Sequence, residues 1–187
     1  MRIVRAAPLC LFVITGLACG PTPPPAGNGG DGGVPTDEVC ASKSLTHVLP
    51  QDWHHTATCM DACGNGLNPP TGGPHCPQWL ACRVYDEAQP LCNWVHNLEH
   101  GHVVLLYNCP GGCPEIVDGL KKIWEEAGAN GAPRRILITP WSGLQKKVAA
   151  VVAGWSWSGD AFDEDAIRCV LSHQDVEAPE AGLECSQ

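Results

Sequence analysis

The cysteines of this chain constrain its fold more than any other feature of the sequence. The chain has 12 cysteines in 187 residues, and only Cys10 and Cys19 lie near the N-terminus. An even set of cysteines in an exported chain predicts a disulfide framework, because thiols outside the cytoplasm are oxidised. We therefore expect five bridges and not metal-bound thiolates, although spacing alone does not select the pairs. The ten residues concerned are Cys40, Cys59, Cys63, Cys76, Cys82, Cys92, Cys109, Cys113, Cys169 and Cys185.

The N-terminus predicts export. Residues 1–18 have the pattern of a signal peptide: Arg2 and Arg5 precede the apolar stretch AAPLCLFVITGLA, which is too short to span a membrane as a helix. The sequence LACG at residues 17–20 resembles a bacterial lipobox, so Cys19 is the expected site of lipid attachment. Gly16 stands where a leucine is usual, which makes an ordinary secretory cleavage nearby the alternative. Both routes predict an exported protein, and the lipobox predicts a membrane-anchored lipoprotein in the periplasm or at the cell surface.

The remainder divides into a tether and one domain. Residues 19–38 contain almost only Pro, Gly and small polar residues, which have nothing to bury and predict a flexible, lipid-anchored tether. Residues 39–187 then form a single disulfide-rich globular domain. The formal net charge is −9 and no basic patch is present, so nucleic acid is not an expected partner. The expected partner is the membrane that holds the anchor, and the sequence identifies no protein partner.

The pattern of apolar residues predicts an α+β domain. Residues 40–92 are rich in Pro, Gly, Asn and Cys and show no sustained period, so we expect irregular structure there. Apolar runs predict buried strands at 103–107, 134–141 and 148–157, and helical spacing predicts helices beginning near Pro114 and Asp163. This order of strand, helix, strand, strand, helix gives a small mixed β-sheet with packed helices, wrapped by the irregular disulfide-rich N-terminal half. A right-handed crossover is expected if the first two strands are parallel, and the second and third strands are expected to pair antiparallel.

The segment HNLEHG at residues 96–101 concentrates residues that are able to perform chemistry. On a helical turn His96 and His100 share a face, with Glu99 beside them in the spacing H-x-x-E-H. On a strand, His96, His100 and His102 would line one face instead. Gly101 favours a break between a short turn and the strand that follows it.

This spacing predicts a transition-metal site. Neutral imidazoles bind zinc and copper, and two imidazoles on adjacent helical turns supply half of a tetrahedral site. We predict zinc or copper binding by His75, His96 and His100, with Glu99 as a fourth ligand or as a partner that orients an imidazole. His75 is the best ligand from the loop region because it follows the rigid turn NPPTGGPH.

Other functions fit the same residues. A group of histidines and a glutamate at the end of a strand can brace loops by hydrogen bonds in a structural or interaction module. In a metal-dependent hydrolase, Glu99 would be the catalytic general base acting on a bound water. Inverzincin peptidases also carry H-x-x-E-H, but on a long helix, whereas a glycine and a strand follow here, so a peptidase is disfavoured. Both a binding protein and an enzyme remain open at this point.

Two further motifs have structural interpretations. The CPGGC loop lies where a thioredoxin active site would lie, but three residues separate Cys109 and Cys113 instead of two, so we expect a structural bridge. His54 and His55 beside Trp53 form either a weak metal site or a solvated loop, and the loop is the expectation.

Three segments together resemble a known family. The sequences NPPTGGPH, VYDEAQP and VHNLEHGHVVLLY, in this order, are similar to the signature of the mostly bacterial domain of unknown function 3105 family, over about residues 68–179. The chain is identified as a cysteine-rich lipoprotein member of that family. The resemblance implies no particular activity. It does imply that His75, His96, Glu99 and His100 belong to one recurring constellation, and that His102 lies at a position that varies.

Overall fold

The computed structural model describes residues 33–49, 52–60, 62–132 and 134–185. The predicted signal peptide, the lipid site at Cys19 and residues 19–32 of the predicted tether lie outside the described residues. Helix α1 (Asp37–Ala41) includes the last two residues that composition assigned to the tether. None of the helices in the described part of the chain is long and apolar enough to cross a membrane.

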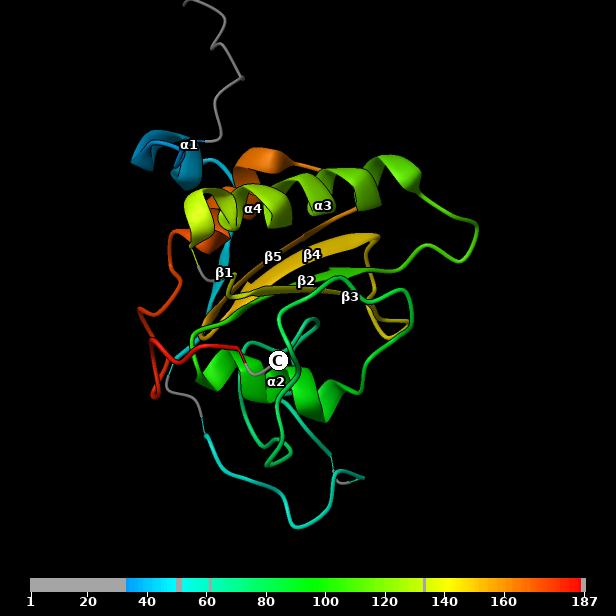
Figure 1. The fold of residues 1–187 in the computed structure, drawn as a ribbon, viewed down its shortest axis with the longest axis vertical. Coiled ribbons are helices and arrows are strands. Elements are labelled where there is room, and N and C mark those ends of the chain that lie inside the picture. The colour runs from blue at the N-terminus through cyan, green and yellow to red at the C-terminus, as the bar shows by residue number, and fades with distance from the viewer. Residues whose placement is uncertain (1–32, 50–51, 61, 133, 186–187) are drawn as a thin grey trace, which may run out of the picture. The chain divides into compact units, whose positions relative to one another are not determined.

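A mixed sheet forms the centre of the domain, as predicted, but it has five strands where the sequence predicted three (Figure 1). The strands are β1 (Thr46–His47), β2 (Val103–Tyr107), β3 (Ile136–Pro140), β4 (Val148–Val152) and β5 (Trp155–Gly159), in the spatial order β1-β5-β4-β2-β3. Strands β2 and β3 are parallel, and the other neighbours are antiparallel. The fold is therefore α+β with a mixed sheet.

Helices cover the two faces of this sheet. Helices α3 (Pro114–Ala127) and α4 (Glu164–Leu171) lie on one face, and α2 (Leu91–Glu99) lies on the other (Figure 1). A short 3-10 helix, η1 (Ala129–Gly131), follows α3. The predicted helix limits are confirmed, since α3 ends before Gly128 and the Asp163 side chain caps α4 by accepting from the Ala166 amide.

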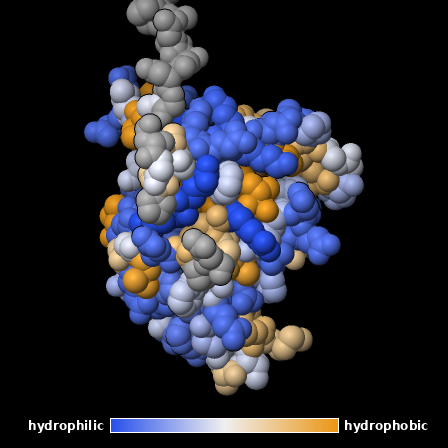
Figure 2. Space-filling model, viewed as in Figure 1, coloured by the Kyte–Doolittle hydropathy of each residue, from blue (hydrophilic) through white to orange (hydrophobic). Residues whose placement is uncertain are grey.

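The pleat of β2 divides the core into two layers. Val103 and Leu105 pack with residues of α3 and α4, whereas Val104 and Leu106 pack with residues of α2. All four side chains are fully buried. A strand buried on both faces explains the continuous apolar run in the sequence. Only three residues separate the end of α2 from the start of β2. Most of the surface seen in Figure 2 is hydrophilic, with hydrophobic residues in separate groups.

Two predictions about the strands were wrong. Residues 148–157 form a hairpin and not one strand, because the chain reverses at Ala153 and Gly154, where Gly154 has φ +74°. Strand β4 pairs with β2 and not with β3. The other edge of β3 is covered by the segment around Val84, which pairs with Ile138. The run VVAGWSW is apolar or small throughout, so one glycine is the only sign of this turn in the sequence.

Five disulfides hold the domain, and all ten predicted cysteines take part. Cys109 and Cys113 form the structural bridge expected of CPGGC. The other pairs join segments that are distant in sequence: Cys40 with Cys169, Cys59 with Cys76, Cys63 with Cys92, and Cys82 with Cys185. Four of the five bridges therefore fasten the segment before α2, and one of them, Cys63–Cys92, joins it to α2 itself. Such a framework fits an oxidising compartment outside the cytoplasm.

Candidate metal centre

The last turn of α2 carries the first part of the site. The helical interpretation of HNLEHG is confirmed, since α2 runs to Glu99 and His100 is its C-cap. His96 and Glu99 are three residues apart and therefore share a face. Gly101 ends the helix with φ +75°, a conformation that favours glycine. A Cβ at this position would lie 2.0 Å from Asp175 Oδ1, so the packing requires glycine as well.

The proline-rich turn brings His75 to this helix. Gly73 has φ +114°, and a Cβ there would lie 2.6 Å from the Gly64 carbonyl carbon. This close contact lets the chain fold back, and the Gly64 amide donates to the Pro74 carbonyl at 2.9 Å. The His75 side chain is fully buried, and its ring centroid lies 4.7 Å from that of His96.

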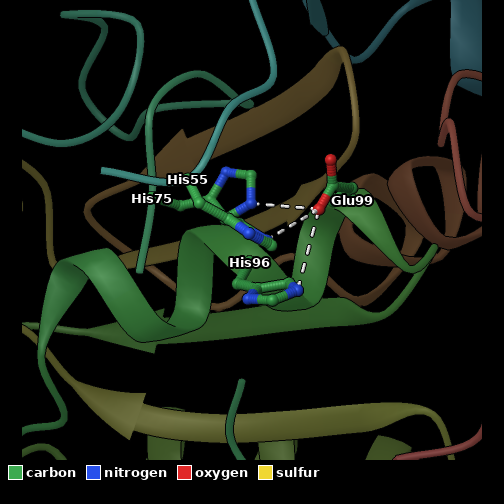
Figure 3. Close-up of side chains that lie close together, drawn as sticks. All are labelled: His55, His75, His96 and Glu99. Carbon is green, nitrogen blue, oxygen red and sulfur yellow. Dashed lines mark ion pairs between the residues drawn. The ribbon is translucent and has the colours of Figure 1, made fainter. Parts of the chain in front are cut away.

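Glu99 is the centre of the cluster. Its Oε2 atom lies 3.0 Å from His75 Nε2, 3.7 Å from His96 Nε2 and 4.0 Å from His55 Nε2 (Figure 3). The ligand-type atoms of these four residues all lie within 4.8 Å of one another. Three imidazole nitrogens therefore face one carboxylate oxygen.

His55 is exposed, as expected of a solvated loop, but its ring also faces the cluster, which the sequence did not predict. His55 and His75 form an isolated parallel bridge, in which the Thr56 amide donates to the His75 carbonyl at 2.8 Å. The Cys59–Cys76 disulfide closes the same loop. His54 also matches the expectation, since its exposed ring lies 3.3 Å from the exposed Asp52. Alternate residues of an extended segment point in opposite directions, so one histidine faces the cluster and its neighbour faces solvent.

Backbone carbonyls fix the tautomers of His75 and His96, the two buried histidines of the four-residue cluster. His75 Nδ1 lies 2.8 Å from the Gly73 carbonyl, and His96 Nδ1 lies 2.6 Å from the Cys76 carbonyl. A carbonyl only accepts, so both Nδ1 atoms carry the proton and donate. In neutral rings, both Nε2 atoms then present a lone pair to the cluster. Metal-binding histidines have this arrangement, with one nitrogen on a carbonyl and the other on the metal.

The His75 ring has an unmet requirement. Its Nε2 lies 3.0 Å from Glu99 Oε2 but finds no hydrogen-bond partner within the described ranges. A short distance without a hydrogen bond is expected if neither His75 Nε2 nor Glu99 Oε2 carries a proton, so that each atom presents a lone pair to the other. A buried lone pair that faces a carboxylate oxygen is unfavourable unless a cation lies between them.

Burial keeps His96 in the form that binds metal. It lowers the pKa of His96 to about 4, and the nearby rings of His100 and His75 lower it further against the opposing effect of the Cys76 carbonyl. Burial also lowers the pKa of His100, although Glu180 and Glu99 raise it. Trp79 contributes to this burial, since its ring packs edge-on against both imidazoles, with centroids 5.2 and 4.5 Å away. His96 is therefore neutral at pH 7.

His100 lies beside the four-residue cluster. Its Nε2 is 3.0 Å from His96 Nε2 and 3.3 Å from Glu180 Oε2. With Glu99 and Glu180 it forms a second group of ligand-type atoms within 4.8 Å of one another. Of the residues predicted from sequence, the structure brings His75, His96 and Glu99 together and places His100 next to them.

The remaining polar residues of the motif act as braces. Asn97 is fully buried, and its amide donates to the Leu80 carbonyl and to His102 Nδ1 while accepting from the Leu80 amide. His102 donates through Nε2 to the Leu183 carbonyl at 2.9 Å. His102 also lies near Cys82 and Cys185, but these two sulfurs are bonded to each other. Asn97 and His102 thus hold the loop at Leu80 and the C-terminal segment at Leu183 by hydrogen bonds.

The fold and this cluster define an α+β domain, crosslinked by disulfides, with three histidines around a glutamate. A family described as "Protein of unknown function (DUF3105)" matches residues 65–187, and the chain belongs to this family. No curated protein and no solved structure matches the chain. The matched region includes His75, His96 and Glu99 but begins after His55. One member of the cluster therefore comes from a segment outside the match.

Proposed function

We propose that this domain binds a transition-metal ion, zinc or copper, through His55, His75, His96 and Glu99. The observation that carries the proposal is the fully buried His75 Nε2, which faces Glu99 Oε2 at 3.0 Å without a hydrogen bond. A cation between the two atoms would convert a repulsive contact into two favourable ones. Protonation of His75 would also do so, but at the cost of burying an imidazolium ion.

The donor set suits these metals. Three imidazole nitrogens and one carboxylate oxygen can complete the tetrahedral coordination of zinc, and imidazole is also a good copper ligand. The neutral state of His96 and the carbonyls behind His75 and His96 prepare the rings for binding. His55 is 53% exposed, so an ion has a route from solvent.

The geometry favours binding over hydrolysis. A hydrolase would need Glu99 free to take a proton from a bound water. Here Glu99 Oε2 is the atom on which the three imidazoles converge, which suits a ligand. We further propose that the domain is held at a membrane by a lipid on Cys19, outside the cytoplasm, where it would meet metal ions directly.

Metal analysis of untagged protein made in an oxidising compartment tests the proposal. Calorimetric titration with Zn²⁺ and with Cu²⁺ should show binding. His75→Ala or His96→Ala should lower the affinity for the ion at least about 100-fold, since loss of a group that only hydrogen-bonds a ligand already lowers it about 10- to 100-fold. Glu99→Gln, which keeps the side-chain volume, should also weaken binding. His54→Ala is the matched control because His54 faces solvent, and it should bind like the wild type.

Two results would contradict the proposal. One is a wild-type protein with no ion above background. The other is a His96→Ala variant whose melting temperature is below that of the wild type by the same amount with and without chelator. In that case the cluster would only brace the loops by hydrogen bonds.

A further inference from the structure

We infer that the site holds a second cation beside the first, bound by His100, Glu180 and the carboxylate of Glu99. This inference rests on the proposed function, because Glu99 belongs to both groups of ligand-type residues. A carboxylate has two oxygens and can bridge two ions. Centres with two metals about 3.5–4 Å apart are a common arrangement in proteins.

The contact between His96 and His100 shows that the two positions are adjacent. Their Nε2 atoms are 3.0 Å apart. The proton of His96 is on Nδ1, so in the metal-free protein His100 Nε2 donates to His96 Nε2. An ion on His96 removes that acceptor and leaves the His100 nitrogen facing Glu180 Oε2 at 3.3 Å. A second ion then binds His100 Nε2 when the proton of this nitrogen moves to Nδ1, which has no hydrogen-bond partner among the described residues.

The C-terminal segment is fixed where this position needs it. The Glu180 amide donates to the Glu99 carbonyl at 3.0 Å, which joins the segment to the end of α2. Arg135 pairs with Asp175 on one side of Glu180 and donates to the Leu183 carbonyl on the other. The segment runs beside α2 in Figure 1, where it is drawn in red. Glu180 is therefore held at the cluster by contacts that do not involve its own side chain.

The second position differs from the first in two ways. Glu180 is 56% exposed, so this position opens to solvent. His100 Nδ1 has no hydrogen-bond partner in the described part of the chain, whereas His75 and His96 each have a carbonyl there. A missing outer partner of this kind weakens metal binding by about 10- to 100-fold. The second ion should bind more weakly than the first by this factor.

Stoichiometry tests the inference on the full, untagged, disulfide-bonded chain. Titration with Zn²⁺ should give two ions per wild-type chain, the second about 10- to 100-fold weaker. Glu180→Gln should bind one ion, with a dissociation constant within about threefold of that of the first ion in the wild type. His100→Gln should also bind one ion. Glu177→Gln is the control, since this carboxylate lies in the same segment but contacts His47 at 3.6 Å, and it should bind two.

Cu²⁺ gives an independent readout. The first equivalent should give the paramagnetic resonance spectrum of an isolated ion, and the second should broaden or diminish it because ions about 4 Å apart couple. One ion per wild-type chain, or two ions in Glu180→Gln, would overturn the inference and leave the first site intact. Zero ions in the wild type would overturn the proposed function as well.

Discussion

Two glycines with left-handed backbones place the histidines of the cluster. Gly73 lets the chain pass close to Gly64 before His75, and Gly101 turns the chain from α2 into β2 directly after His100. Neither contributes a ligand. Each occupies a position where a side chain would collide with fixed neighbours, so the geometry of the site depends on the absence of a Cβ.

Replacement of Gly101 by alanine should be strongly destabilising. The left-handed backbone alone costs about 1–2 kcal/mol for a residue with a Cβ. The new methyl group would also displace the Asp175 carboxylate, which receives two hydrogen bonds from Arg135. We expect a total loss of about 3 kcal/mol in the free energy of unfolding, measured by urea denaturation.

Gly66→Ala is the control for that measurement. Gly66 has φ +80°, and a Cβ there meets nothing within 4 Å among the described residues. This variant should lose only about 1–2 kcal/mol. Equal losses in the two variants would show that the contact with Asp175 adds nothing.

The sequence predicted three of the four cluster residues for a clear reason. His96 and Glu99 share a helix face at a spacing of three, and His75 follows a turn whose glycine and prolines fold the chain back. His55 was missed because nothing local distinguishes it from the solvent-facing His54. Its position depends on the backbone bridge to His75 and on the Cys59–Cys76 pair, and pairings cannot be read from cysteine spacing.

At the scale of elements, the cluster is a meeting of three segments held by disulfides. Helix α2 supplies two residues, and the segments around His55 and His75 supply one each. These segments have little secondary structure of their own, so the Cys59–Cys76 and Cys63–Cys92 bridges replace the packing of regular elements. The bridges near the site should therefore affect function, whereas distant bridges should affect stability alone.

A pair of double variants separates these effects. Cys59→Ser/Cys76→Ser should lower metal affinity about 10- to 100-fold by releasing His55, and should lower the free energy of unfolding by about 3 kcal/mol from loop entropy. Cys40→Ser/Cys169→Ser opens a larger loop between α1 and α4 and should cost about 5 kcal/mol, with the affinity unchanged. Affinity should be measured by calorimetry at a temperature where circular dichroism shows each variant folded. A similar loss of affinity in both variants would mean that global stability, and not the local bridge, controls the site.

Some elements of the sheet layer were predicted from the sequence, and the hairpin and the strand pairing were not. Strand β2 and helices α3 and α4 were predicted because their apolar periods are long and their ends carry proline, glycine or a capping aspartate. The hairpin of β4 and β5 was read as one strand because a single glycine marks its turn. The pairing of β4 with β2 depends on the link at residues 141–147. Asn108 holds this link by donating to the Leu144 carbonyl, a contact between residues far apart in sequence.

At the scale of the whole molecule, stability is tied to the neutral state of buried histidines. His102, like His96, has its pKa lowered to about 4, mainly by burial, with the Leu183 carbonyl opposing and the charge of Arg135 contributing. In the unfolded chain both rings should titrate near pH 6.5. Between these values the unfolded chain binds protons that the folded domain does not, so acid favours unfolding.

The free energy of unfolding of the metal-free domain should therefore fall as the pH falls from about 6.5 to about 4, by up to roughly 3 kcal/mol for each of the two histidines. Above pH 7 these two histidines should contribute little change with pH. Urea denaturation in the presence of chelator measures this directly. His102→Gln removes one titrating ring away from the cluster and should make the curve shallower. Saturating Zn²⁺ at pH 7 should add about 3 kcal/mol when its free concentration is 100 times the dissociation constant, and this gain should disappear in the same acid range, because protons compete for the ligand nitrogens. A stability that stays flat between pH 6.5 and 4 would mean that His96 and His102 bind protons equally in the folded and unfolded states, and would contradict the lowered pKa of both rings.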